Sequence, residues 1–177
     1  EISKNNIYSC PQTLHKIHPE FDEVLGSILN KDKKGILYFI KDVNKTYYKK
    51  LLKRFKKNKY LDLDRIKFTD GLTWEEYINH CGKASVLLDP FYFGSGNSFY
   101  ESMYYGTPTV TKPTNYMKSR LVLGAYKQMG LEKAPIVNTI EDYADLAVEL
   151  ANDSKLLDIK KHYSKKAKEK LYENKSV

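Results

Sequence analysis

The 177-residue sequence is short of the residues that mark several large classes of protein. Its two cysteines, Cys10 and Cys81, are too few for a disulfide scaffold and lack zinc-finger spacing. A reducing compartment is therefore expected, and we predict a cytoplasmic protein. No stretch approaches the roughly 20 apolar residues needed to cross a membrane, and no signal segment opens the chain. The sequence starts at Glu1 rather than at a methionine, which is expected for a piece of a longer protein.

Familiar ligand-binding motifs are missing as well. The sequence has no GxGxxG dinucleotide fingerprint and no GxxxxGK[ST] phosphate loop. His15 and His18 have only Cys10 and Glu20 as further metal-ligating neighbours along the chain, so no metal is expected. No Ser-His-Asp order, nucleophile elbow or carboxylate pair stands out. An enzyme with this sequence would therefore bind and polarise its substrate rather than supply a nucleophile.

Positive charge, in contrast, is abundant. The formal net charge of +8 suggests an anionic partner. The lysines concentrate in segments 45–59 and 158–170, where apolar residues such as Tyr48, Leu51 and Phe55 recur at helical spacing. These segments are typical of amphipathic helices with a solvated lysine face. Because no nucleic-acid-binding motif accompanies them, nucleic acid is not the expected partner.

Segments with the hydrophobic pattern of strands alternate along the chain with segments that have the hydrophobic period of helices. Short apolar runs predict strands at 6–10, 35–42, 65–69, 85–89, 107–111 and 134–137. Longer amphipathic segments predict helices at 19–31, 44–58, 73–84, 97–105, 115–130, 139–153 and 154–172. Thr73 with Glu76 forms a capping-box pattern, and Asn44 and Thr139 are the expected N-caps of their helices. The alternation predicts an α/β fold, a doubly wound Rossmann-like parallel sheet, with residues 1–177 as one domain.

Ligands of such sheets bind at the carboxyl ends of the strands. That rule places the loops 10–18, 69–74, 89–98 and 111–118 on one rim. The third loop carries the run Gly94-Ser95-Gly96-Asn97-Ser98 before an expected helix, whose free N–H groups attract anions. Glu101 lies one helical turn further on the same face, within reach of a ribose hydroxyl pair. The alternative is an ordinary strand-to-helix turn with Asn97 or Ser98 as its cap.

Two other rim segments carry candidate ligand-binding side chains. In the first loop, Gln12 can pair with a base or sugar hydroxyl, and Lys16 can neutralise a phosphate, especially a leaving diphosphate. On the helix at 73–84, Trp74, Tyr77 and His80 are spaced to share one face. That face forms either a wall for a planar base or a half-buried aromatic surface.

Three segments together resemble a known family. They are YSCPQTLHKIHPEFDEVLGSIL (8–29), LLDPFYFGSGNSFYESMYYGTPTVT (87–111) and SRLVLGAYKQMGLEK (119–133). They are similar to the carboxyl-terminal half of the O-GlcNAc transferase family. These are inverting, metal-independent GT-B protein glycosyltransferases, with bacterial glucosyltransferase and fucosyl-type relatives. The resemblance implies that this chain is the donor-binding half of such an enzyme. The acceptor-binding half would lie in an N-terminal region that this sequence does not include.

The resemblance also implies roles for individual residues. Gln12 and Lys16 would face the donor diphosphate, with Lys16 as the catalytic group that stabilises the leaving phosphate. The nucleotide-binding residues would be Gln12, Lys16, Leu72, Tyr77, His80, Gly96, Asn97, Ser98 and Glu101. Relatives carry a histidine and an arginine where this chain has Tyr77 and His80, which leaves the base open between UDP and GDP.

The sequence thus predicts the donor domain of a protein glycosyltransferase that passes GlcNAc or glucose from a UDP-sugar to Ser, Thr or Asn side chains. No cofactor and no metal are expected, and the fragment alone is expected to be inactive. The rival hypothesis is a degenerate, non-catalytic Rossmann module that docks a protein or polyanion through its basic helix faces. A third possibility is a GT-B enzyme acting on glycans or lipids.

Overall fold

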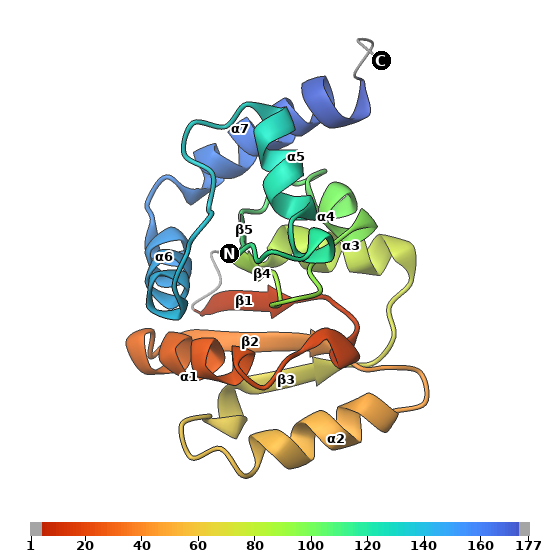
Figure 1. Cartoon of the computed structure of the whole chain (residues 1–177), viewed down its shortest axis with the longest axis vertical. Coiled ribbons are helices and arrows are strands. Elements are labelled where there is room, and N and C mark those ends of the chain that lie inside the picture. Colours follow the sequence, from red (N-terminus) through yellow and green to blue (C-terminus); the bar gives the residue numbers. More distant parts are fainter. Residues whose placement is uncertain (1–4, 174–177) are drawn as a thin grey trace.

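The computed structural model describes residues 5–173, so the first and last four residues of the predicted domain lie outside the described part. Five parallel strands form one sheet in the order β3-β2-β1-β4-β5, which confirms the predicted doubly wound fold (Figure 1). The strands are β1 (Asn6–Cys10), β2 (Gly35–Ile40), β3 (Ile66–Thr69), β4 (Val86–Leu88) and β5 (Thr109–Val110). The chain builds outward from β1 to β3 and then returns to the other side of β1. The direction of winding therefore reverses between β1 and β4.

Seven α-helices connect and cover these strands within the described residues (Figure 1). They are α1 (Phe21–Lys31), α2 (Thr46–Phe55), α3 (Trp74–Lys83), α4 (Asn97–Ser102), α5 (Leu121–Met129), α6 (Ile140–Asn152) and α7 (Leu156–Ala167). Helix α7 continues into a π-helical turn at Lys168–Tyr172, and short 3-10 turns occupy Leu14–Lys16, Leu63–Arg65 and Met117–Ser119. No helix between residues 5 and 173 has the length and apolar character needed to cross a bilayer.

The alternation of side chains along each strand divides the core between the two faces of the sheet. Tyr8, Phe39 and Val86 point to one face and share a buried cluster with residues of α1, α2 and α6. Leu87 points to the opposite face, where it packs with Cys81 of α3. A third cluster joins α4, α5 and α7 beyond the β5 edge. Both faces of the sheet are thus covered, as parallel sheets require.

Three local predictions differ from the structure. Asn44 does not cap α2; instead the Asp42 carboxylate accepts the N–H groups of Thr46, Tyr47 and Tyr48 at 2.7, 3.2 and 2.8 Å. The predicted helix at 115–130 is interrupted at Arg120 and consists of a 3-10 turn followed by α5. The predicted strand at 134–137 is reduced to one bridge, between Thr111 and Ile136.

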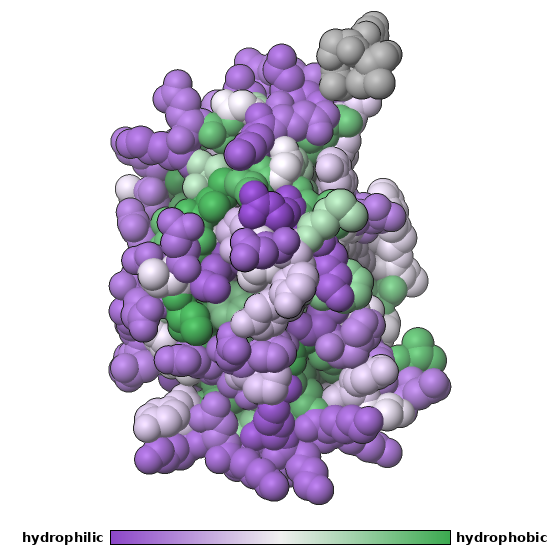
Figure 2. Space-filling model, viewed as in Figure 1, coloured by the Kyte–Doolittle hydropathy of each residue, from purple (hydrophilic) through white to green (hydrophobic). Residues whose placement is uncertain are grey.

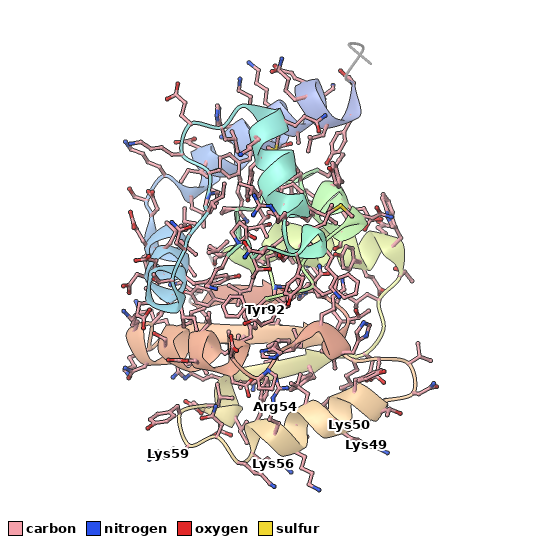
Figure 3. All side chains as sticks on the ribbon, in the orientation of Figure 1. Lys49, Lys50, Arg54, Lys56, Lys59 and Tyr92 are labelled. Carbon is pink, nitrogen blue, oxygen red and sulfur yellow. The ribbon has the colours of Figure 1, made fainter. Side chains whose placement is uncertain are left out.

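The lysines of the basic segment 45–59 face solvent. Figure 3 shows Lys49, Lys50, Lys56 and Lys59 along the outer edge of the molecule, whereas Arg54 lies on the side of α2 that faces α1. Arg54 donates to the Asp22 carboxylate at 2.7 and 2.9 Å. In Figure 2 the lower edge formed by α2 is almost entirely hydrophilic. The lysine face of α2 is therefore solvated, as its pattern predicts.

Helix α7 packs tightly against the turn that precedes β5. Gly106 in this turn has φ +66°, and a Cβ placed there would meet the Lys160 carbonyl oxygen at 1.9 Å. The Lys160 ammonium in turn donates to the carbonyl oxygens of Gly82 and Ala84, at the end of α3, at 2.9 and 2.5 Å. Burial lowers the pKa of Lys160 to about 8. Only glycine fits at position 106, because of both its φ and its lack of space.

Candidate functional site

A pocket of about 480 Å³ lies where the winding of the sheet reverses. Its walls come from the loops that follow β1, β3 and β4 and from the first turns of α3, α4 and α5. The lining residues are Pro11, Gln12, Thr13, Lys16, Leu72, Thr73, Trp74, Tyr77, Phe93, Gly96, Asn97, Ser98, Glu101 and Leu121. The pocket therefore brings together every predicted site residue except His80.

Gln12 and Lys16 connect the β1 loop to the β4 loop. The buried Gln12 side chain donates from Nε2 to Ser98 Oγ at 2.7 Å. Its Oε1 accepts a hydrogen bond from Lys16 Nζ at 3.0 Å, and the same ammonium donates to the Gly94 carbonyl at 3.1 Å. The 3-10 turn at Leu14–Lys16 carries the lysine back toward Gln12. This chain of contacts fixes a positive charge at the pocket wall.

The surroundings of Lys16 have two opposing effects on the pKa of its ammonium group. Partial burial lowers the pKa of its ammonium group, and the nearby Asp89 carboxylate raises it again. Its Nζ also lies 4.3 Å from the centre of the Phe93 ring, in a cation–π arrangement. Lys118 approaches the same ring at 5.0 Å. Two cations thus lie close to the Phe93 ring beside the pocket.

The loop after β4 is built around the buried Asp89 carboxylate. Its Oδ1 accepts the Ser95 N–H at 2.6 Å, and its Oδ2 accepts the Thr111 hydroxyl at 2.7 Å. Burial raises the pKa of Asp89 to about 6, and the bonds to Thr111 and Ser95 oppose that shift. A Cβ on Gly94 would lie 2.8 Å from both carboxylate oxygens. The loop can wrap this closely around Asp89 only because residue 94 is glycine.

Backbone strain marks the same loop at Tyr92. This residue has φ 67°, in a region that bulky residues rarely adopt. Its hydroxyl donates to Glu20 Oε2 at 2.7 Å, and its ring meets His18 edge-on with 4.8 Å between the ring centres. Figure 3 places Tyr92 beside α1, between the sheet and the upper helices. These contacts hold the strained residue in place.

Helix α4 begins directly after this loop without a side-chain cap. Gly96 occupies the N-cap position and makes no side-chain capping bond, so neither Asn97 nor Ser98 caps the helix. Asn97, Ser98 and Glu101 all line the pocket, as their spacing predicts. The Glu101 carboxylate has no hydrogen-bond or ion-pair partner among residues 5–173. The pocket therefore has uncapped backbone N–H groups and one available acceptor along the same helix.

The opposite wall is aromatic. Trp74 and Tyr77 lie on α3, whose predicted capping box is present: Glu76 Oε2 accepts the Thr73 N–H at 2.8 Å. The Tyr77 hydroxyl is buried and has no hydrogen-bond partner in the described part of the chain. Burial raises its pKa well above the ordinary value. Leu72 completes this wall from the loop after β3.

His80 lies behind this wall rather than in it. Its Nε2 is 2.7 Å from Ser9 Oγ on β1, and its ring meets Tyr38 edge-on. Burial lowers its pKa, and Lys83 adds to this shift. The face shared by Tyr77 and His80 is therefore split: Tyr77 reaches the pocket and His80 packs against the sheet.

Several pocket residues were not among the predicted ones. Pro11, Thr13 and Thr73 come from the rim loops, so their position near a ligand follows from the fold. Phe93 and Leu121 lack a polar group that would have indicated a site. Within residues 5–173, no three His, Cys, Asp or Glu side chains gather to hold a metal. The predicted absence of a metal requirement remains a prediction.

A parallel sheet whose winding reverses, with a lysine- and amide-lined pocket at the switch point, defines a Rossmann-like α/β domain. More particularly, the chain belongs to glycosyl transferase family 41, whose family model matches residues 2–177. This finding confirms the resemblance to the O-GlcNAc transferases.

Curated relatives agree with that membership. The chain is 26% identical over 145 residues to the probable UDP-N-acetylglucosamine–peptide N-acetylglucosaminyltransferase SEC of Arabidopsis thaliana, covering 82% of this chain and 15% of that protein. It is 25% identical over 152 residues to a UDP-glucose:protein N-beta-glucosyltransferase of Actinobacillus pleuropneumoniae, covering 85% and 24%. The chain thus spans less than a quarter of the length of these relatives.

Solved structures show the same fold. An O-GlcNAc transferase variant from Thermobaculum terrenum matches with a TM-score of 0.82 and 19% identity, over 94% of this chain and 32% of that one. Anabaena HepE, solved in complex with UDP and glucose, matches with a TM-score of 0.68 and 13% identity, over 96% and 45%. These likenesses confirm the fold of one half of a GT-B glycosyltransferase.

Proposed function

We propose that this chain is the donor-binding domain of an inverting, metal-independent protein glycosyltransferase. It would take GlcNAc or glucose from a UDP-sugar for transfer to Ser, Thr or Asn side chains. The observation that carries the proposal is the pocket at the switch point, in which hydrogen bonds join Gln12 to Lys16 and to Ser98. The family membership and the names of the relatives support glycosyl transfer as the activity of the complete protein.

The proposed donor lies with its diphosphate between Lys16 and the start of α4. The Lys16 ammonium neutralises the charge that develops on the leaving diphosphate, which lowers the barrier without a metal. The nearby Asp89 carboxylate favours the charged form of Lys16. Backbone N–H groups at Gly96, Asn97 and Ser98 face the phosphates.

The remaining pocket residues accommodate the nucleoside. Glu101 accepts hydrogen bonds from the ribose hydroxyls, because its carboxylate lines the pocket and has no partner among residues 5–173. The base lies against Leu72, Trp74 and Tyr77. His80 has no direct contact in this arrangement, since it packs on Ser9. Its predicted place in the nucleotide site is therefore left out of the proposal.

The proposal is tested by calorimetric titration of the chain with UDP, GDP and their sugar conjugates in the presence of a chelator. UDP should bind, and Lys16→Ala should weaken it about 10- to 100-fold, as expected for a hydrogen bond to a charged group worth about 1.5–3 kcal/mol. Asn97→Ala should weaken binding as well. The matched control is Lys53→Ala, an exposed lysine on α2, which should leave the affinity unchanged.

Other outcomes would contradict parts of this proposal. A preference for GDP would move the donor to the fucosyl-type branch. In the full-length protein, Lys16→Ala should mainly lower turnover, and unchanged turnover would remove its leaving-group role. If a folded full-length protein bound no sugar nucleotide, the donor-domain proposal would be wrong.

The second candidate function is a binding module that docks a polyanion through α2. The observation that favours it is the row of exposed lysines at positions 49, 50, 53, 56, 57 and 59. It predicts binding of heparin that weakens steeply with salt and disappears when Lys49, Lys50 and Lys53 become glutamine. Under this alternative, UDP would not bind and Lys16→Ala would have no effect.

A further inference from the structure

A second hollow of about 590 Å³ adjoins the donor pocket (α3 and α4 in Figure 1). It lies between α3, α4 and the π-helical turn at Lys168–Tyr172. Trp74 and Glu101 line both hollows. We refer to the second one as the aromatic groove.

Large aromatic rings in this groove are open to solvent. Trp74 is 69% exposed, Tyr104 64% and Tyr172 45%, and Tyr105 also lines the groove. Isolated exposed rings are common, but several gathered around one hollow mark an interaction surface. The pocket at the switch point does not account for Tyr104, Tyr105 or Tyr172, because they do not line it.

The charge of the groove is opposite to that of the chain. The chain has 30 lysines and arginines and a net charge of +8, yet no lysine or arginine among residues 5–173 lines the groove. Its ionisable acids are Glu75 and Glu101. Neither carboxylate has a hydrogen-bond or ion-pair partner among residues 5–173. A cationic occupant would complement this lining, and an anionic one would be repelled.

The polar groups of the tyrosines are largely used within the protein. The Tyr105 hydroxyl donates to Asn79 Oδ1 at 2.9 Å, and the Tyr172 hydroxyl donates to the Tyr100 carbonyl oxygen. The groove therefore offers ring faces and carboxylates rather than a dense set of free donors and acceptors. Sugars need such a set for their hydroxyls, whereas an ammonium or guanidinium group needs π-faces and a counter-charge.

The geometry points to the aromatic groove as a docking site for a basic polypeptide segment, with a lysine or arginine side chain seated between the Trp74 and Tyr104 rings and the Glu75 and Glu101 carboxylates. This inference does not depend on the proposed donor function. The segment would bind as an extended or helical stretch across α3 and α4, next to the pocket. The overall positive charge of the protein disfavours non-specific attraction of such a segment. Binding would therefore indicate a specific interaction with the residues that line the groove.

The sequence provides its own reporter for the test. Trp74 is the only tryptophan, and it lies in the groove. Titration with acetylated, amidated pentalysine should change Trp74 fluorescence in a saturable manner that weakens with added salt. Pentaglutamate should produce no change. If chitotriose changed the emission and pentalysine did not, the groove would be a saccharide site and the inference would be overturned.

Two substitutions distinguish the groove from other binding surfaces. Tyr104→Leu removes an exposed ring, and Glu75→Gln removes a charge in the first turn of α3. Each should weaken pentalysine binding about two- to fivefold, the range for an exposed cation–π or ion-pair contact. The matched controls are Tyr60→Leu, another exposed tyrosine, and Glu141→Gln, at the equivalent position of α6.

Equal pentalysine affinity in all four variants would overturn the inference, because binding would then lie elsewhere. Circular dichroism and UDP titration of the same proteins complete the test. Tyr104 and Glu75 are exposed, so their variants should remain folded. Neither residue lines the donor pocket, so UDP should bind as before. Loss of UDP binding in the unsubstituted chain would count against the donor proposal and leave the groove result intact.

Discussion

The loops after β4 and β3 face each other across the pocket but are built in opposite ways. The β4 loop, residues 89–96, is anchored to the buried Asp89 carboxylate and holds Tyr92 in a strained conformation. In the β3 loop, Asp70 is exposed and pairs with Lys41 at 3.2 Å, and Gly71 has no neighbour within 4 Å of an added Cβ. The side proposed for the diphosphate is thus fixed before any ligand arrives, whereas the side proposed for the base is open. Rigid phosphate recognition with an adaptable base wall would let one fold accept different nucleotides.

The largest expected effect concerns the ionisation of Asp89. Its pKa in the folded state is raised to about 6, whereas its ordinary value is 3.8. Between these values the folded state holds a proton that the unfolded state has lost, so the free energy of unfolding falls as pH rises through this window. Well above pH 6, Asp89 is ionised in both the folded and the unfolded state, so its contribution to the free energy of unfolding no longer changes with pH.

Urea unfolding of the wild type and of Asp89→Asn at pH 4, 5, 6 and 7 measures this term. The stability difference, wild type minus variant, should fall by up to about 3 kcal/mol from pH 4 to pH 7. Other carboxyl groups cancel in this difference. A difference that did not vary with pH would show that folding does not raise the pKa of Asp89.

A second prediction compares the two loop glycines directly. Gly94→Ala places a Cβ against the Asp89 carboxylate and should lower the free energy of unfolding by about 1–3 kcal/mol and weaken UDP binding. Gly71→Ala meets open space and should change stability by less than about 0.5 kcal/mol. Thermal unfolding and calorimetry of both variants give the answer. Similar losses of stability in the two variants would show that the β4 loop is no more tightly packed than the β3 loop.

The smallest expected effect is on the open side. Thr73→Ala removes the capping box of α3 and should cost about 1 kcal/mol of stability. Thr139→Ala removes a comparable N-cap from α6, away from the pocket, and is the matched control. Stability should fall in both variants, while only Thr73→Ala should also alter UDP affinity. If both variants bound UDP like the wild type, Thr73 would have no part in the base wall.

The sequence predicted the parts of this fold that depend on local periodicity. Alternating apolar strands and amphipathic helices were enough for the sheet, and the loops at its carboxyl ends followed from topology. The N-cap of α2 was predicted wrongly, because Asp42 lies four residues before Thr46 and reaches three N–H groups only through the left-handed turn at Lys45. The strand at 134–137 was too short for its tertiary pairing to be predicted.

The candidate site was predictable where polar residues lie between the end of a strand and the first turn of the next helix. Gln12, Lys16 and Asn97 meet this condition, and the structure brings them into one pocket. His80 does not, because helical spacing gives the face of a helix but not how deeply that face packs against a sheet. The hydrogen bond between His80 and Ser9 joins residues 71 positions apart, which no local pattern reveals. Phe93 was not predicted for a similar reason, because its contacts with Lys16 and Lys118 depend on the tertiary structure.

The contact between Gly106 and α7 can form only late in synthesis, after the pocket segments have been made. A chain emerging from the ribosome completes all the pocket segments, from Pro11 to Leu121, before residues 160–164 exist. Until then the Gly106 turn lacks its contact with the backbone of α7, and the end of α3 lacks the ammonium of Lys160. A nascent chain stopped before Leu156 would therefore carry every ligand-facing residue on an unfinished scaffold. Helix α7 is made after the pocket segments, and it closes the domain.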